Sequence, residues 1–195
     1  MTPLTPRQTS SLPYIRGWLY FVAFLVFCMV IVGGATRLTD SGLSITEWQP
    51  LLGAIPPFTQ ADWLAAFEKY RQIPEYQVVN NGMSLDEFKF IYWWEWSHRF
   101  LGRFIGLAVF LPLAYFAATG SMNMKTFLRC CLLFVLGGLQ GALGWYMVAS
   151  GLVDRVDVSQ YRLSAHLTVA TVIFGVTLWI AYGLDRQRRR PEEGR

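Results

Sequence analysis

The chain has 195 residues, of which 53% are hydrophobic and 15% are charged, and its formal net charge is +4. This composition is far more apolar than that of a soluble domain of the same length, so it excludes an ordinary water-soluble fold and predicts a surface that faces lipid. The positive charge would favour nucleic-acid binding in a soluble protein, but the basic residues lie at the ends of apolar segments, so we expect membrane lipid and no nucleic acid as a partner.

Four apolar runs are long enough to cross a bilayer as helices, which takes about 20 residues each. They lie near residues 17–35, 98–119, 127–150 and 163–184. The first run is long, lacks a small-residue cleavage site and is followed by three more, so we interpret it as a retained span and not as a signal peptide. The predicted fold is an all-α integral membrane four-helix bundle over residues 14–185.

The two ends of the chain are expected to lie outside this bundle. Residues 1–13 contain three prolines and several Ser and Thr, which predicts a disordered lead-in. Residues 186–195 are predicted to be a basic tail. Basic residues also border the turn between the second and third spans, so the positive-inside rule places both termini in the cytoplasm. Arg155 and Arg162, in the other short loop, count against this orientation.

The outer loop, residues 36–97, is too long to be a simple connection. Residues 48–57 are apolar and interrupted by prolines, which favours a segment on or dipping into the membrane interface. Further on, Trp63, Phe67 and Tyr70 recur at helical spacing. They predict a short amphipathic helix that rests on the bundle or on lipid headgroups.

A second helix of the outer loop is predicted to start at Ser84. Glu87 follows three positions later, as in a capping box. We expect this helix to run towards Trp96 and to continue into the second span. The aromatic residues between positions 88 and 96 are typical of an interfacial belt, although some of these rings could also wall a flat aromatic ligand.

His98 and His166 are the two histidines of the chain, near the starts of the second and fourth spans. These spans run in the same direction, so both imidazoles should lie at similar depth, about one turn inside the outer boundary. Two histidines on facing helices of a bundle can ligate one haem iron from opposite faces. A lone intramembrane histidine is as often a packing bridge as a ligand, but two at matched depth favour ligation.

Four further residues are candidates for this site. Glu95 lies three positions before His98, so a continuous helix places both on one side, where a partly desolvated carboxylate could transfer protons. The alternative is a solvated interfacial Glu paired with Arg99 or Arg103. The two arginines could pair with haem propionates or extend to lipid phosphates. Gln140, an amide inside the third span, must find a partner and is a further candidate for contact with haem.

Several ordered stretches across residues 17–184 carry a family resemblance. They are Gly33–Thr39, Ser41–Ile45, Trp48–Pro50, Gly53–Pro57, Glu75–Tyr76, Glu87–Lys89, Glu95–Arg99, Gly137–Gly141 and Arg162–His166. In these stretches the chain resembles the haem A synthase family, specifically the bacterial and mitochondrial type that lacks a cysteine pair in the first outer loop.

This resemblance implies oxidation of the methyl group of haem O to the formyl group of haem A, with the oxygen supplied by water, for the cofactor of a terminal oxidase. It implies His98 and His166 as the axial partners of the substrate haem O, and Glu95 as the catalytic carboxylate. It also implies the cell inner membrane as the location and haem O synthase as a partner.

The family carries a second four-helix bundle, whose own histidine pair holds haem b, whereas this chain ends after its fourth span. We therefore expect an amino-terminal half, or a half that associates with a second copy to imitate the usual pair. The alternative function is a non-catalytic b-type membrane cytochrome or haem carrier that uses the same histidines only to hold haem. Glu95 on the histidine face, beside a large outer loop, favours the enzyme.

Overall fold

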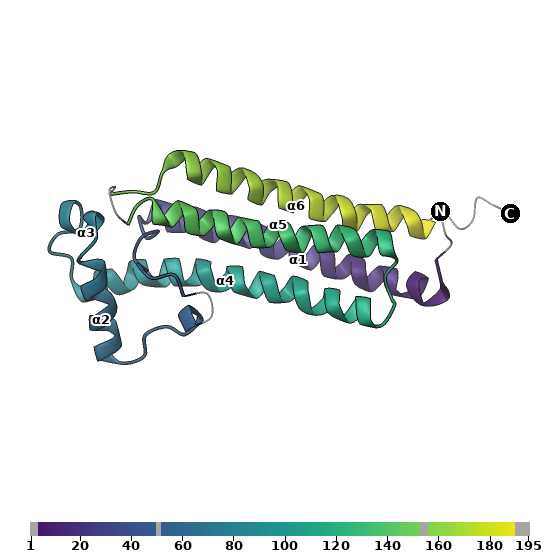
Figure 1. Ribbon diagram of the computed structural model, residues 1–195, viewed down its shortest axis with the longest axis horizontal. Helices are drawn as coiled ribbons and strands as arrows, with labels where there is room; N and C mark the ends of the chain where they lie inside the picture. Colours follow the sequence, from purple (N-terminus) through teal and green to yellow (C-terminus); the bar gives the residue numbers. More distant parts are fainter. Residues whose placement is uncertain (1–3, 50–51, 153–155, 190–195) are drawn as a thin grey trace. The chain divides into compact units, whose positions relative to one another are not determined.

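All regular structure in the computed structural model, which describes residues 4–49, 52–152 and 156–189, is helical. The long helices are α1 (Pro6–Leu38), α4 (Leu85–Ala118), α5 (Met124–Ala149) and α6 (Gln160–Arg189). Each contains a stretch long and apolar enough to cross a membrane, which confirms the all-α class and the four predicted spans. The outer loop carries η1 (Leu52–Ala54), α2 (Gln60–Tyr70) and α3 (Pro74–Val78) (Figure 1).

The chain forms two compact units, and each long helix contributes to both. The first unit comprises residues 1–27, 104–139 and 169–195. The second comprises residues 28–103 and 140–168. The second unit contains the whole outer loop together with both histidines, so it is the unit in which the candidate site is built.

The first unit packs parts of all four long helices around one apolar core. Members of this core come from each helix: Leu12, Leu113, Cys130 and Ile180. The indole nitrogen Nε1 of Trp18 donates a hydrogen bond to the Ala108 carbonyl oxygen at 2.7 Å, which joins α1 to α4. This unit is therefore a four-helix bundle, as the apolar periodicity predicts.

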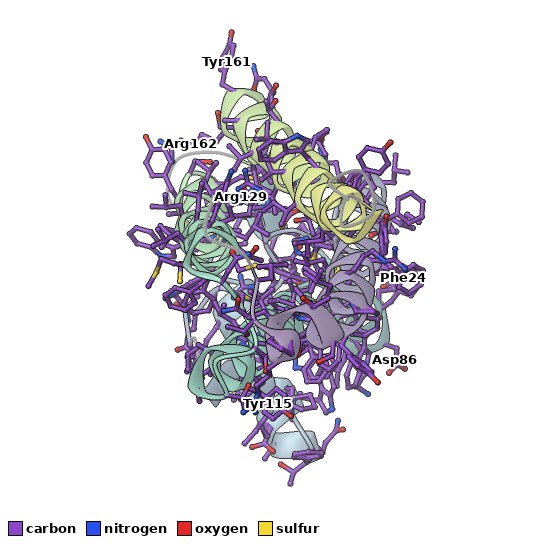
Figure 2. The ribbon with its side chains drawn as sticks, turned by 90° about the vertical axis from the view of Figure 1, so that its right-hand side faces the viewer. Phe24, Asp86, Tyr115, Arg129, Tyr161 and Arg162 are labelled. Atoms are coloured by element: carbon purple, nitrogen blue, oxygen red, sulfur yellow. The ribbon has the colours of Figure 1, made fainter. Side chains whose placement is uncertain are left out.

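The outward surface of the first unit is also apolar. Phe24 and Tyr115 are more than half exposed, and Figure 2 shows both side chains pointing away from the helices. Leu111 and Leu128 are exposed in the same way. Such a surface suits lipid tails, because a helix bonds most of its backbone groups internally and the exposed side chains are largely apolar.

The prediction of a disordered lead-in over residues 1–13 is wrong from Pro6 onwards, because α1 begins there. Thr5 caps the helix: its Oγ1 accepts from Gln8 N at 3.2 Å, and its own N donates to Gln8 Oε1 at 3.1 Å. Proline is tolerated in a first helical turn, where its missing N–H is not needed. Leu12 and Ile15 are buried in the core, so tertiary packing outweighs the loop-like local composition.

The basic tail predicted over residues 186–195 is helical as far as Arg189, where α6 ends. Residues 190–195 lie outside the described residues, as does Arg155, one of the two loop arginines that count against the predicted orientation.

Helix α4 joins the predicted loop helix and the predicted second span into one element. At its start, Ser84 Oγ accepts a hydrogen bond from Glu87 N at 3.3 Å, and Glu87 Oε2 accepts from Ser84 N at 2.8 Å. These bonds form the expected capping box. The helix then runs without interruption to Ala118, so the candidate residues between positions 95 and 103 share one rigid support.

Helix α2 lies beside the first turns of α4 in the second unit (Figure 1). Its buried face consists of Trp63, Phe67 and Tyr70, as the periodicity predicts. The ring of Phe67 stacks on Phe88 of α4 with centroids 4.9 Å apart, and Trp63 meets Tyr92 edge to face at 5.0 Å. The amphipathic helix therefore rests on protein through aromatic contacts.

The predicted interfacial belt between positions 88 and 96 divides into two sets. Phe88 and Tyr92 are buried in the core beneath α2, so the prediction is wrong for them. Phe90 and Trp93 remain exposed. Helical periodicity explains the division, since only one side of α4 faces α2.

Candidate functional site

Each histidine of the second unit packs against a glycine on a neighbouring helix. A β-carbon placed on Gly33 of α1 would lie 3.0 Å from Nε2 of His98 on α4. A β-carbon on Gly144 of α5 would lie 3.0 Å from Cε1 of His166 on α6. Real β-carbons essentially never come closer than this, so the bare glycine backbone is what makes room for each imidazole.

The two histidines lie on α4 and α6, in the second unit. The Nδ1 atom of His166 is buried and has no hydrogen-bond partner among the described residues. A buried polar atom without a partner is uncommon in folded proteins and often marks an absent water, ion or ligand. Imidazole nitrogens are usual ligands of haem iron, so the chemistry of the two side chains is compatible with the predicted haem, and their role as its ligands stays a prediction.

Gln140 of α5 lies next to His166. Its Nε2 donates to the main-chain oxygen of His166 at 2.9 Å, which gives the amide the partner that a polar group inside a bilayer needs. The Oε1 atom of Gln140 is buried and has no partner among the described residues. The side chain thus ties α5 to α6 beside the histidine and leaves one acceptor atom for a ligand or a water molecule.

Glu95 is buried, with 2% of its surface exposed. Its Oε2 accepts from Ser44 Oγ and from Ile45 N, both at 2.7 Å. Its Oε1 accepts from Arg99 Nη2 at 2.6 Å. The pairing with Arg99 that the sequence leaves open is therefore present, but in a buried setting and not at a solvated surface. Three donors converge on one carboxylate, which is how a buried anion is stabilised.

Arg99 extends this network to the outer loop. Its Nη2 donates to the Ile45 carbonyl oxygen at 2.8 Å, and its Nη1 donates to the Glu47 carbonyl oxygen at 3.0 Å. The guanidinium carbon lies 5.9 Å from the ring centre of Trp48. Arg99 therefore joins Glu95 to the outer loop, and its guanidinium turns to loop carbonyl oxygens instead of extending towards lipid phosphates, one of the two alternatives that the sequence left open.

Arg103 makes a similar contact one turn further along α4. Its Nη2 donates to the Gln49 carbonyl oxygen at 2.9 Å, and a β-carbon placed on Gly53 would lie 3.0 Å from the same nitrogen. Both arginines thus hold the loop segment 45–49 against α4. The predicted pairing of Arg99 and Arg103 with propionates stays a prediction.

The sequence reasoning missed two parts of this site. Ser44 and Ile45 supply donors to Glu95 from about fifty positions earlier, and no local pattern indicates that contact. Glu75 of α3 is buried as well, and it and Glu95 are the buried carboxylates of the described residues. A charged residue in a short loop helix is usually exposed, so the sequence carries no clear signal that Glu75 is buried.

These features define a multi-pass helical membrane protein whose second unit contains two histidines and a carboxylate buried under the loop segment 44–45. The chain belongs to the family of cytochrome oxidase assembly proteins, whose family model matches residues 16–195.

The chain is similar to proteins named heme A synthase. It is 63% identical to that of Parvibaculum lavamentivorans over 170 residues, which cover 87% of this chain and 49% of the relative. It is 58% identical to that of Azorhizobium caulinodans over 180 residues, or 92% of this chain and 52% of the relative. The chain thus spans about half the length of these curated relatives. No solved structure matches it. The resemblance to the haem A synthase family is confirmed.

Proposed function

We propose that this chain is a haem A synthase, or its substrate-binding half, which oxidises the methyl group of haem O to the formyl group of haem A with oxygen from water. The observation that carries the proposal is Glu95, buried and held by three donors, on the same helix and three residues before His98. The identity of 63% with a heme A synthase supports it. An electron carrier needs no such carboxylate next to its iron ligand.

In this proposal His98 and His166 hold the iron of the substrate haem O. Gly33 and Gly144 leave room for the imidazoles, and Gln140 steadies the main chain at His166. A propionate is an anion that arginine can bind through two parallel hydrogen bonds, so Arg99 and Arg103 are the candidates to meet the propionates.

Conversion of a methyl group and water to a formyl group releases protons as well as electrons. Glu95 is the group that accepts these protons or removes one from the attacking water. Ser44, Ile45 and Arg99 hold its two oxygens in place, so the base does not have to find its position during the reaction. The haem b that the resemblance implies for a second bundle would supply an electron acceptor.

We also infer the cell inner membrane as the location, with both termini in the cytoplasm. Basic residues in the amino-terminal part of α1, at the start of α5 and at the end of α6 support this orientation through the positive-inside rule. The site then lies at the outer side of the membrane, and haem O synthase is the enzyme expected to deliver the substrate.

The proposed function is tested by the pigment that the protein carries. The full-length protein is purified from cells able to make haem O, and its haem is extracted and separated by chromatography. Haem O, hydroxylated haem O or haem A is the expected result. Haem b alone would contradict the proposal and favour a b-type cytochrome or haem carrier, which would use the same two histidines.

A further inference from the structure

The loop segment 45–49 is fastened to α4 by its main-chain oxygens. Three alternate carbonyl oxygens accept hydrogen bonds from two arginines: those of Ile45 and Glu47 from Arg99, at 2.8 and 3.0 Å, and that of Gln49 from Arg103, at 2.9 Å. Alternate residues of an extended chain have the same orientation and lie about 6.6 Å apart. Four residues of a helix advance about 6 Å, so arginines one helical turn apart match this spacing.

The side chain of Trp48 extends the same segment to α5. Its ring lies against that of Trp145, with ring centres 6.4 Å apart. Trp145 follows Gly144, which packs on His166. The segment therefore reaches from α4, the helix that carries His98, to the part of α5 that contacts the other histidine.

The hydrogen bonds of Arg99 already use the donors that a carboxylate needs. A guanidinium binds a carboxylate in two parallel bonds through Nη2 together with either Nη1 or Nε. Both hydrogens of Arg99 Nη2 are used, one by Glu95 Oε1 at 2.6 Å and one by the Ile45 carbonyl oxygen at 2.8 Å. The pair with Glu95 is buried, so breaking it would leave an uncompensated charge. A carboxylate that binds Arg99 in this way therefore displaces the carbonyl oxygen of Ile45.

Ile45 links this exchange to Glu95. Its nitrogen donates to Glu95 Oε2 at 2.7 Å, and the hydroxyl of Ser44 donates to the same oxygen at 2.7 Å. Ile45 thus contacts Arg99 through its oxygen and Glu95 through its nitrogen. When Arg99 releases the oxygen, Ile45 loses one of these two contacts with α4, and the bond to Glu95 is weakened with it.

We propose that the propionate groups of the substrate haem take Arg99 and Arg103 from the carbonyl oxygens of segment 45–49, so that the segment opens when the substrate binds. This inference rests on the proposed function for the identity of the ligand. An ionised carboxylate attracts a guanidinium more strongly than a neutral carbonyl oxygen does, so the exchange is favourable. Propionates and the closed segment compete for the same donors. By linkage, any change that weakens the closed segment must strengthen the binding of propionates.

The first arm of the test measures amide hydrogen exchange in the full-length protein, resolved to single amides by mass spectrometry. Haem b has the same two propionates as haem O, whereas in its dimethyl ester both are blocked and the iron can still bind imidazole. Haem b should speed the exchange of the Ile45 amide about tenfold, because its hydrogen bond to the buried Glu95 is weakened. The ester should leave this amide unchanged. The amide of Phe67 in α2, outside the segment, should exchange equally with both ligands.

The second arm measures the affinity for haem b and for the ester in variants that keep the charge. Trp48→Ala removes the contact with Trp145 and the position of the ring 5.9 Å from the Arg99 guanidinium. It should bind haem b about twofold to tenfold more tightly than wild type and bind the ester equally. Trp93→Ala removes another exposed tryptophan, on α4 outside the segment, and should change neither affinity. A purely structural role of the segment predicts weaker haem binding in Trp48→Ala.

Equal effects of haem b and its ester on the Ile45 amide, or slower exchange with haem b, would overturn the inference. Haem binding in Trp48→Ala that is no tighter than in wild type would overturn it too. The two proposals fail separately. Haem A formation by a protein whose segment does not respond to propionates contradicts this inference alone. A segment that responds in a protein that forms no haem A contradicts the proposed enzymatic function alone.

Discussion

Glu95 performs two tasks with one carboxylate. It pairs with Arg99 within α4, and it accepts hydrogen bonds from Ser44 and Ile45 of the outer loop. It therefore holds the loop against α4 in addition to its proposed role in catalysis. Removing one partner of a buried ion pair is far more disruptive than exchanging an exposed charge, because the other partner is left without compensation. The catalytic and the structural contributions of Glu95 therefore have to be separated by the choice of substitution.

Glu95→Gln keeps the size of the side chain and one acceptor oxygen while removing the base. We expect haem to remain bound and haem A formation to fall by about 10²-fold to 10⁴-fold, the usual contribution of general acid–base catalysis. Extracted haem, separated into haem O and haem A, measures the effect. Asp86→Asn, at an exposed position of the same helix, is the control. Unchanged haem A formation in Glu95→Gln would remove the residue from the mechanism.

Gly33 and Gly34 are neighbouring glycines that provide a test position and a control position for the contact with His98. A β-carbon at Gly33 would meet His98 Nε2 at 3.0 Å, whereas one at Gly34 meets nothing within 4 Å. We expect Gly33→Ala to displace the imidazole and to lower the haem content of the purified protein several-fold. Gly34→Ala should leave it unchanged. The absorption spectrum and the haem-to-protein ratio measure both variants, and equal haem content would contradict a close packing of His98 on α1.

The pKa of Glu75, raised by burial from 4.5 to about 7, affects stability. Between these values the folded state holds a proton that the unfolded state has lost, so the free energy of unfolding falls as the pH rises. Above pH 7 the full difference of about 3 kcal/mol is lost. Glu75→Gln lacks this titration.

Thermal unfolding should therefore show the Glu75→Gln variant to be more stable than wild type near pH 8, with the gain disappearing towards pH 4.5. The wild-type and variant proteins are compared in the same detergent at each pH. A gain that is constant across the range would mean that the carboxyl group of Glu75 does not titrate there.

At the scale of elements, α4 is the support of the site, because its capping box, its contact with α2 and its candidate residues follow one another along a single helix. Gly137 and Gly141 of α5 have the GxxxG spacing that favours tight packing of one helix on another. The structure does not show such packing at these two positions. β-Carbons placed there meet nothing within 4 Å among the described residues, whereas Gly144 lies against His166. The close contact between α5 and His166 is therefore made by Gly144, one turn beyond Gly141.

Helix α2 packs on α4 in the second unit through the ring of Phe67. This ring is buried and stacks on Phe88, so Phe67→Ala should cost about 3–5 kcal/mol and detach α2 from α4. Faster proteolysis of the outer loop in the folded protein measures the detachment. Leu64→Ala, at an exposed position of α2, should leave the digestion rate near that of wild type. Equal rates for the two variants would show that this contact does not hold the loop.

At the scale of the whole molecule, both units expose apolar side chains, but the histidines and the buried carboxylates of the described residues occur in the second unit. The first unit is a bundle with apolar residues both inside and outside, as lipid requires. The second unit contains the buried carboxylates, the histidines and the aromatic core under α2. The chain spans about half the length of the curated relatives that it matches.

Much of this arrangement follows from the sequence. The lengths of the apolar runs predict four spans, Ser84 and Glu87 predict the start of α4, and the spacing of Glu95 and His98 predicts that they share one helix. These features are local, since hydrogen bonding within a helix and the need to bury apolar length act over a few residues or one span.

Other features depend on contacts between distant segments, and only the tertiary structure decided them. Ser44 and Ile45, near the start of the outer loop, donate to Glu95 near its end, and Glu75 is buried although a charged residue of a short loop helix is usually exposed. Arg99 turns to loop carbonyl oxygens and not to lipid. Burial and the choice of a hydrogen-bond partner depend on which segments pack together in the folded chain. Neither helical periodicity nor residue type determines which distant segments are in contact.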